Sequence, residues 1–229
     1  MHFSRSPNVA ALAAVAATTL LLPGRAQAAP ACPDADMPLH GYSWFLREHP
    51  GNGLGAMFAL ADEQARASRA VACLVDAERH ANGLPPLKRL EGVDTSAYIY
   101  ARAAAGRKWW TDKADKHADP RDPRETSVQI HDRISRQHPC TTYVGDGHQL
   151  LADAENVYDG WGDPEAGGPE KSTPAGAFAW WKKSPPHEAA ILDGRWTHTS
   201  VGVVAGTADP AAGDADPSGV YVQHFMACS

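Results

Sequence analysis

The spacing of apolar residues changes along this chain, from a helical period in the first two thirds to strand-like runs near the C-terminus. Residues 61–80 carry apolar side chains three to four apart and end before Asn82-Gly83, which predicts a helix with one buried stripe. The late runs TSVGVVAG and GVYVQHFMA are rich in Val and Tyr and predict two strands. Helices first and strands last favour a layered α+β domain over a parallel doubly wound sheet.

Further helices are predicted between these two regions, at 94–110, 127–136 and 173–182. Either Asp94 or Thr95 can cap the first of them, because both side chains accept hydrogen bonds from free backbone amides. The last begins with Thr173 as its cap and Pro174 at its first position, where proline costs no hydrogen bond.

Two segments lack a regular period. Residues 29–55 mix proline, glycine and aromatic side chains, and we expect an ordered but irregular N-terminal extension. Residues 207–218 are rich in Gly, Asp, Pro and Ala, which predicts a long, exposed connection between the two C-terminal strands.

The first residues have the order of a secretory signal. A basic start precedes the apolar stretch 9–22, and the small-residue pattern Ala26-Gln27-Ala28 follows. The apolar stretch is shorter than the roughly 20 residues of a membrane-spanning helix, and no later segment is a candidate. We therefore predict a signal peptide over 1–28 and a secreted, extracellular mature protein that starts near Ala29.

Charge and cysteine content indicate which partners to expect and whether the cysteines form disulfides. The formal charge of −6 is modest and spread along the chain, which disfavours nucleic acid as a partner. Four cysteines in an exported chain predict two disulfides, and the sequence leaves three pairings open. None lies in a C-x-x-C pair, so a redox motif is not expected. Cys32 and Cys228 lie near the two ends, where disulfides would hold the termini.

Five landmarks follow one another along the chain: CLVDAERHANGLPPL, KWWTDKADKHADPRDP, ADAENVYDGWG, AFAWWKKSPPHEAAILDGRWTHTSVGVV and YVQHF. In this order they resemble the bacterial branch of the CAP superfamily, also called the SCP/PR-1 domain, over residues 68–228. The first landmark closely matches the family's LLNAERAKAGLPPL. Others depart from the pattern, since Ala154 replaces the glycine of GEN and Pro186 the glycine of WxxSPGHRxNIL. We therefore predict an extension over 29–67 and a CAP domain over 68–229.

The resemblance implies an α-β-α sandwich, with a small, largely antiparallel sheet between helical layers. It also implies a central cleft lined by histidines and glutamates, which in several members binds a divalent cation. Carried over by position, the cleft residues are His117, Glu155 and His187. His198 is a candidate fourth ligand because it lies where the chain re-enters the sheet. The expected cofactor is a divalent metal ion, Zn²⁺ or Mg²⁺.

Chemistry alone supports this set only in part. Two neutral imidazoles and a carboxylate suit Zn²⁺ with one position left for water, but no H-E-x-x-H motif is present. Each residue also has a structural alternative. His187 could cap or pack at a helix start, Glu155 could bind backbone amides in a loop, His117 could be solvated and His198 could lie at a strand edge.

Three functions are compatible with these residues. The first is a secreted binding protein whose cleft holds a cation and whose surface takes a small lipid, sterol, peptide or cell-envelope ligand. The second is a metal-assisted extracellular hydrolase with Glu155 as the general base. The third is a structural or host-interaction module in which the histidines only pack. The binding protein ranks first, because no nucleophile-base-acid triad is recognisable.

Overall fold

The computed structural model describes residues 31–92, 95–140, 148–162 and 169–229. The predicted signal peptide and the proposed cap Asp94 lie outside these residues. The helices are α1 (Tyr42–Glu48), α2 (Gly53–Ala81), α3 (Ser96–Arg107), α4 (Thr126–Ser135), α5 (Pro174–Lys183) and α6 (Pro185–Leu192). The strands are β1 (Lys88–Leu90), β2 (Leu150–Trp161), β3 (His198–Ala205) and β4 (Ser218–Cys228), and two short 3-10 helices are η2 (Pro169–Ser172) and η3 (Pro210–Ala212).

The strands form one sheet in the order β1-β3-β4-β2, in which only the short β1 to β3 pairing is parallel. The sheet is therefore largely antiparallel, as predicted. The two long strands β2 and β4 pair along almost their whole length, and Glu155 lies opposite His224. On the other side of β4, His224 lies opposite Ser200. This register places Glu155 and His224 next to each other on one face.

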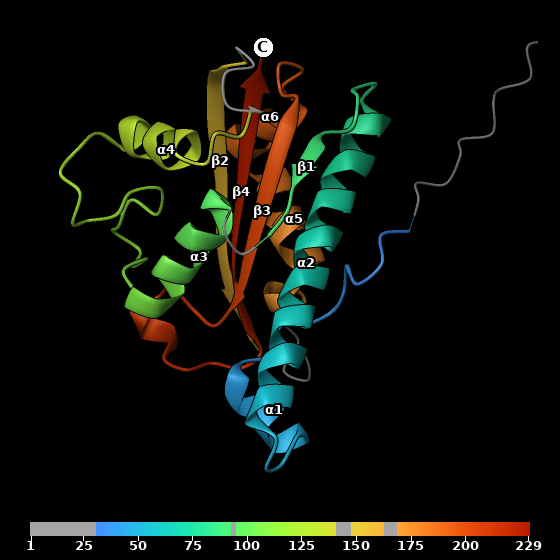
Figure 1. Cartoon of the computed structure of the whole chain (residues 1–229), viewed down its shortest axis with the longest axis vertical. Coiled ribbons are helices and arrows are strands. Elements are labelled where there is room, and N and C mark those ends of the chain that lie inside the picture. Colours follow the sequence, from blue (N-terminus) through green and yellow to red (C-terminus); the bar gives the residue numbers. More distant parts are fainter. Residues whose placement is uncertain (1–30, 93–94, 141–147, 163–168) are drawn as a thin grey trace, which may run out of the picture.

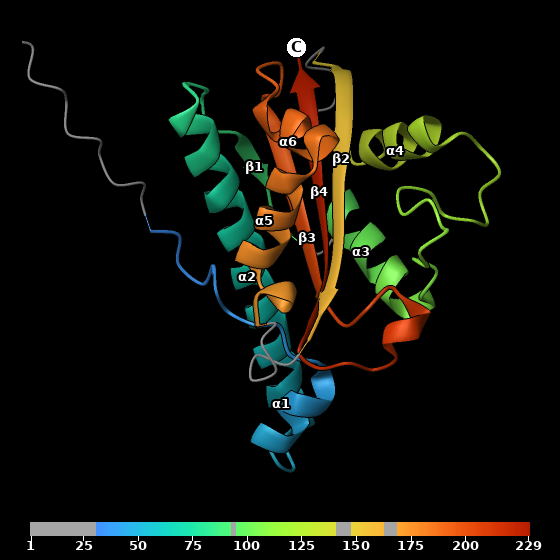
Figure 2. The same cartoon turned by 180° about the vertical axis from the view of Figure 1, so that it is seen from behind.

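Helices cover both faces of this sheet. On one face α2, α5 and α6 pack against a cluster that includes Val71, Trp181, Ile191 and Phe225. On the opposite face α3 packs against β3 and β4, and α4 lies against β2 (Figure 1). Figure 2, the view from behind, has α5 and α6 in front of the strands. The predicted α-β-α sandwich is confirmed.

The N-terminal region is more regular than predicted. The helix expected over 61–80 is α2, which begins eight residues earlier at Gly53, and α1 precedes it. The Asn52 side chain caps α2 by accepting a hydrogen bond from the Gly55 amide at 2.8 Å. The prediction of an irregular segment over 29–55 was therefore wrong for its second half, because α1 and the start of α2, capped by Asn52, lie there. The boundary predicted between residues 67 and 68 falls inside α2.

The helices predicted over 94–110, 127–136 and 173–182 are present as α3, α4 and α5. Thr95 caps α3 by accepting a hydrogen bond from the Tyr98 amide, and Thr173 caps α5 before Pro174. Lys108 adopts a left-handed conformation and ends α3 three residues before the predicted end. Trp110 therefore lies beyond the helix, where it is fully buried.

The connection between β3 and β4 is partly buried, in contrast to the exposed loop predicted over 207–218. Ala208 and Asp209 are buried, and their amides both donate to the Asp159 carboxylate at 2.9 Å. The Ala208 carbonyl accepts a hydrogen bond from the Trp110 amide at 2.9 Å. These contacts join the connection to β2 and to the segment after α3.

Arg79 links the helix of the first landmark to the helix that carries His187. Its guanidinium is fully buried and donates to the carbonyls of Pro85, Ile191 and Asp193 at 3.1, 2.8 and 2.9 Å. Three carbonyl partners offset much of the cost of burying a cation. Arg79 thereby holds the C-terminal end of α6 against α2.

Two disulfides are present, as predicted, and the structure selects one of the three pairings. Cys32 bonds to Cys73 in α2, and Cys140 bonds to Cys228 at the end of β4. The first bond ties the N-terminal segment to α2, and the second ties the turn after α4 to the end of β4.

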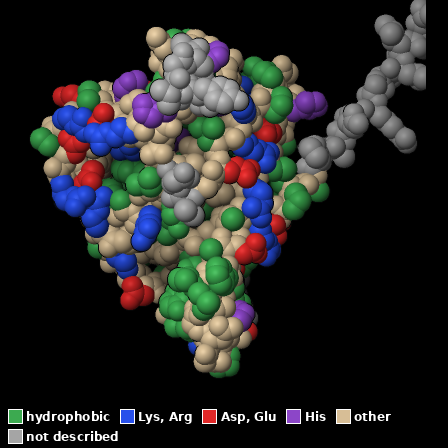
Figure 3. Space-filling model, in the orientation of Figure 1, with side chains coloured by type: hydrophobic (Ala, Val, Ile, Leu, Met, Phe, Trp, Pro, Cys, Tyr) green, Lys and Arg blue, Asp and Glu red, His purple; other side chains and the backbone are tan. Residues whose placement is uncertain are grey.

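The surface carries mixed charge. Figure 3 shows basic and acidic side chains interspersed over the flank formed by α3 and α4. Many of them pair with one another, as Arg107 does with Asp119 and Arg136 with Asp132. No helix in the described part of the chain combines the length and apolar character needed to cross a membrane.

Candidate functional site

Glu155 is the centre of the candidate site. Its side chain is fully buried although the residue lies on β2, an edge strand of the sheet. A buried carboxylate is costly unless charged or hydrogen-bonded partners surround it. The prediction from chemistry alone had allowed Glu155 to be a loop carboxylate, whereas the residue lies within a strand.

Three side chains supply four contacts to the Glu155 carboxylate. Its Oε1 lies 2.9 Å from His117 Nδ1 and 2.9 Å from Arg133 Nη2, and its Oε2 lies 2.7 Å from His224 Nε2 and 3.1 Å from Arg133 Nε. An ionised carboxylate offers about four acceptor positions. The hydrogen-bonding capacity of Glu155 is therefore filled by residues of this chain.

These partners decide the protonation state of Glu155. Burial alone would raise its pKa, but the hydrogen bonds from His117 and His224 and the charge of Arg133 outweigh burial and lower the pKa below its usual range. Glu155 is consequently a carboxylate at neutral pH and a weak base.

His224 lies opposite Glu155 on the neighbouring strand β4, and its side chain is fully buried. Its Nδ1 lies 2.8 Å from the hydroxyl of Ser96, so a neutral ring with a proton on Nε2 donates to Glu155 and accepts from Ser96. Burial lowers the pKa of His224, which agrees with the neutral form. His224 was quoted in the YVQHF landmark but was not predicted as a site residue.

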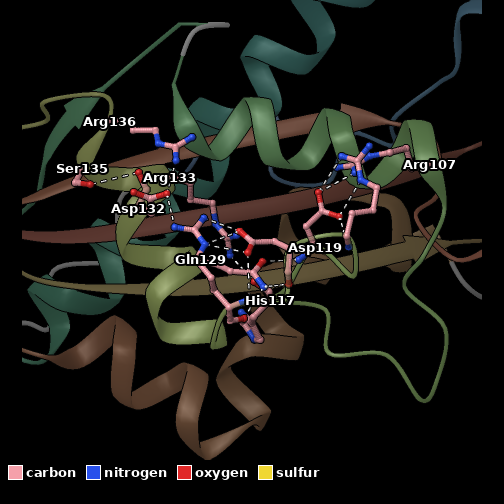
Figure 4. A network of polar contacts seen from close by, with 11 residues as sticks. Arg107, His117, Asp119, Gln129, Asp132, Arg133, Ser135 and Arg136 are labelled. Atoms are coloured by element: carbon pink, nitrogen blue, oxygen red, sulfur yellow. Dashed lines mark hydrogen bonds and ion pairs between the residues drawn. The ribbon is translucent and has the colours of Figure 1, made fainter.

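Arg133 reaches Glu155 from the last turn of α4 and was not predicted either. The face of the Tyr100 ring supports its guanidinium, with Cζ 3.8 Å from the ring centroid. Its Nη2 also donates to the His117 carbonyl, so Arg133 contacts both the backbone of His117 and the carboxylate that His117 binds. Figure 4 shows Arg133 and His117 together at the centre of this polar network.

The long segment before α4, which carries His117, is fixed by Gln129. This buried side chain accepts from the Asp119 amide at 2.8 Å and donates to the carbonyls of Asp122 and Arg124, both at 2.9 Å. The Arg107 to Asp119 ion pair at 2.7 Å joins the same segment to α3. His117 therefore lies on an ordered segment, and not on a freely solvated one.

His187 meets His117 at the outer edge of β2. The two rings stack with centroids 6.1 Å apart, and His187 Nδ1 lies 2.7 Å from the Ser184 hydroxyl. The Asn156 side chain donates to the His187 carbonyl at 3.2 Å, which holds the first turn of α6 against β2. Burial, followed by the nearby His117, lowers the pKa of His187 to about 4. The ring is therefore neutral at pH 7.

The structure thus brings together three of the four predicted residues, His117, Glu155 and His187. His198 lies elsewhere, on β3, where it is opposite Met226 and its Nδ1 is 2.8 Å from the Thr197 hydroxyl. Strand β4 separates β3 from β2, so His198 and Glu155 lie on strands that are not neighbours.

A hollow continues from His187 along the outer edge of β2. Trp180 lines this hollow and also contacts His187, and its ring centroid lies 5.0 Å from that of His187 and 5.7 Å from that of Tyr158. The hollow has a volume of about 650 Å³. Its side-chain lining includes Tyr158, Trp161, Trp180, Lys171, Lys183 and Asp36. Of the two adjacent tryptophans in α5, Trp181 is buried while Trp180 is 47% exposed.

The predicted metal set does not form a ready coordination site. Across residues 31–92, 95–140, 148–162 and 169–229, no group of three His, Cys, Asp or Glu side chains is arranged to hold a metal ion. Both oxygens of Glu155, moreover, already accept hydrogen bonds from neighbouring side chains. Metal binding stays a prediction from the resemblance, and the residues present do not fit it.

Two solved structures are similar to this chain at low sequence identity. One is an extracellular protein containing a SCP domain from Bacillus anthracis, with 16% identity, a TM-score of 0.47, and 72% of this chain and 42% of that chain covered. The other is a cysteine-rich secretory protein from Staphylococcus aureus, with 13% identity, a TM-score of 0.43, and 72% and 40% covered. This chain therefore spans less than half the length of either. A comparison with curated proteins finds no match.

The family assignment comes from the sequence of the domain itself. The family model described as CAP, the cysteine-rich secretory protein family, matches residues 73–225, which extend from the C-terminal half of α2 into the last strand, β4. This range contains the whole Glu155 site and all five landmarks begin within it. The chain therefore belongs to the CAP family, as its ordered motifs predicted.

Proposed function

We propose that this protein is an extracellular binding protein and that its ligand is an acidic glycan of the cell envelope, held along the outer edge of β2. The observation that carries the proposal is Trp180, a large aromatic side chain that is 47% exposed between His187 and the hollow. Large aromatic rings are usually buried in a protein without a partner, so an exposed one at a hollow favours a binding role.

The lining of the hollow suits a sugar with acidic groups. Trp161 and Trp180 offer ring faces on which the apolar side of a sugar can stack. Lys171 and Lys183 are exposed and form no ion pair with any described residue, so both ammonium groups are available to a ligand carboxylate. Asp36 adds an acceptor for sugar hydroxyls.

The location rests on two features. The predicted signal peptide would direct the chain to export, and two disulfides are the usual stabilisation of proteins outside the cytoplasm. An exported protein meets envelope polymers directly, which favours them over intracellular ligands.

Geometry disfavours the alternative of a hydrolase with Glu155 as its general base. A general base needs a free oxygen within reach of the proton it removes and a pKa near the working pH. Both oxygens of Glu155 accept hydrogen bonds from its neighbours, and its pKa is lowered. Glu155 is better suited to orienting His117.

Isothermal titration of the purified protein with soluble peptidoglycan fragments that carry free carboxylates tests the proposal. Wild-type protein should bind, and Trp180→Ala should lose most of the affinity because it removes the stacking surface. The double variant Lys171→Ala/Lys183→Ala should weaken binding of acidic fragments more than binding of a neutral chitin oligosaccharide.

Matched controls are Phe58→Ala, which removes an aromatic ring that is 65% exposed on α2, and Lys113→Ala, which removes an exposed lysine far from the hollow in sequence. Both should bind like wild type. Unchanged binding by Trp180→Ala would contradict the proposal. So would binding to phosphatidylglycerol vesicles without binding to any glycan, since that result would identify a lipid ligand.

A further inference from the structure

In this chain a cationic side chain, Arg133, binds the glutamate of the residue set that the family resemblance implies. Arg133 makes two of the four contacts to Glu155, one to each carboxylate oxygen. The side chain of Arg133 is only 16% exposed and that of Glu155 is fully buried. We infer that the Arg133 guanidinium takes the position at Glu155 that a divalent cation would need. The Glu155 site therefore excludes metal unless Arg133 is replaced.

The first argument is the count of acceptor positions. A metal ion bound to Glu155 must use a lone pair of one of its oxygens, and about four lone-pair positions exist. His117, His224 and Arg133 use four. A cation therefore cannot bind Glu155 without displacing one of these partners, and Arg133 alone holds two of the four positions.

The second argument is charge. Arg133 and Glu155 form an ion pair whose charges cancel. A divalent cation at this site would therefore meet no net negative charge and would lie close to a guanidinium. Repulsion between cations is strong where burial limits screening by water.

The third argument is that Arg133 cannot easily move away. Its guanidinium lies on the Tyr100 ring, and it also donates to the His117 carbonyl. The Tyr100 hydroxyl in turn donates to the Lys116 carbonyl at 2.8 Å, next to His117 in the chain. The guanidinium is therefore held from below, by Tyr100, and from the side, by the segment that carries His117.

Replacement of Arg133 would release a donor set with metal-binding chemistry. His117 and His224 would both remain within hydrogen-bond distance of Glu155, and a carboxylate with two imidazoles suits Zn²⁺. A glutamate at position 133 would add a second carboxylate and reverse the local charge. The inference does not depend on which ligand the hollow binds.

Zn²⁺ titration by calorimetry, together with metal analysis after dialysis, tests this inference. The measured quantity is the Zn²⁺ binding that is lost when His117 is replaced by Ala. Taking this difference excludes any binding by surface histidines. Wild-type protein should show no such binding. Arg133→Glu should gain one Zn²⁺ per chain, bound at least about tenfold more tightly than any residual binding by wild type, and Zn²⁺ should raise the Tm of this variant only.

Arg136→Glu is the matched control, because Arg136 is the C-cap residue of the same helix, pairs with Asp132 and is largely exposed. It should gain no Zn²⁺. If Arg133→Glu does not fold, as judged by circular dichroism, Arg133→Gln serves instead and should also gain binding. His117-dependent Zn²⁺ binding by wild type would overturn the inference. A folded Arg133 variant without gained binding would overturn it as well.

Discussion

The two faces of the sheet are stabilised by different kinds of contact. Between the sheet and α2, α5 and α6 lies an apolar cluster with several large side chains, including Trp181, Ile191 and Phe225. Under α3 and α4 the apolar cluster consists mainly of small residues, such as alanines and valines, and the buried polar group of Glu155, His224 and Arg133 adjoins it.

Contacts on the apolar face mainly provide stability, whereas contacts on the α3 and α4 face mainly fix the positions of the site residues. Apolar packing has no preferred direction and tolerates small changes in shape, whereas charged hydrogen bonds require defined distances and angles. The face that carries the directional contacts is also the face that orients His117. We therefore expect conservative substitutions to be costly on the α3 and α4 face and mild on the opposite one.

The largest effect should come from removing one partner of the buried ion pair. Arg133→Gln leaves the Glu155 carboxylate buried without its compensating charge and should lower the free energy of unfolding by about 3–5 kcal/mol. Urea unfolding followed by circular dichroism measures this loss. Glu155→Gln should cost a similar amount, because its new amide would point donors at Arg133 or at the histidines.

A double-mutant cycle sharpens this prediction. Arg133→Gln/Glu155→Gln should cost clearly less than the sum of the two single variants, since the second substitution removes the charge that the first leaves unpaired. Additive losses would mean that Arg133 and Glu155 do not act as a pair, and the contrast between the two faces would lose its basis.

Arg79 is the exception on the apolar face and should rank second. Arg79→Lys keeps the charge but cannot reach three carbonyls at once, because an ammonium lacks the planar fork of a guanidinium. We expect a loss of about 1.5–3 kcal/mol in urea unfolding, the usual value of hydrogen bonds to a charged group. Arg89→Lys is the control, since Arg89 makes a single ion pair with Asp76 nearer the surface. Equal losses in both variants would contradict the role given to Arg79.

A conservative change in the apolar cluster should have a smaller effect. Ile191→Val removes one methylene group from a fully buried side chain and should cost about 0.5–1.5 kcal/mol. The same unfolding experiment measures it. If Ile191→Val destabilised the protein as much as Glu155→Gln, the apolar face would not be the more tolerant one.

The sequence predicted the helices better than the centre of the site. The helix before Asn82 and the one capped by Thr173 combine local periodicity with local caps, so each could be recognised within its own segment. Strand β2 was not recognised, because LLADAENVYDGW contains Asp, Glu and Asn, which are rare in strands. Its stability comes from pairing with β4, in which partners lie from 57 residues (Trp161 and Ser218) to 78 residues (Leu150 and Cys228) apart along the chain.

The same reason explains which site residues were missed. His117, Glu155 and His187 were found through motifs, whereas Arg133 and His224 belong to no motif that assigns them a role. One local signal was available for each. His224 is two residues from Val222 and four from Val220, so the three share one face of the strand. Arg133 lies one helical turn after Gln129. Neither signal reveals that the two side chains meet at Glu155, because that contact depends on the tertiary fold.

The smallest effect should appear in the dependence of stability on pH. His187 has a pKa of about 4 in the folded protein, against an ordinary value of 6.5, so below pH 6.5 the unfolded chain binds a proton that the folded chain does not. Stability should fall between pH 6.5 and 4, by about 1 kcal/mol after allowance for partial exposure, and His187→Gln should remove this loss. Asp159 acts in the opposite sense, because burial raises its pKa to about 6 and the folded protein gains stability as the pH falls from 6 toward 4. Comparing Asp159→Asn and His187→Gln with wild type at pH 7.5 and pH 5 separates the two, and equal pH slopes in wild type and His187→Gln would show that the cleft does not hold His187 in its neutral form.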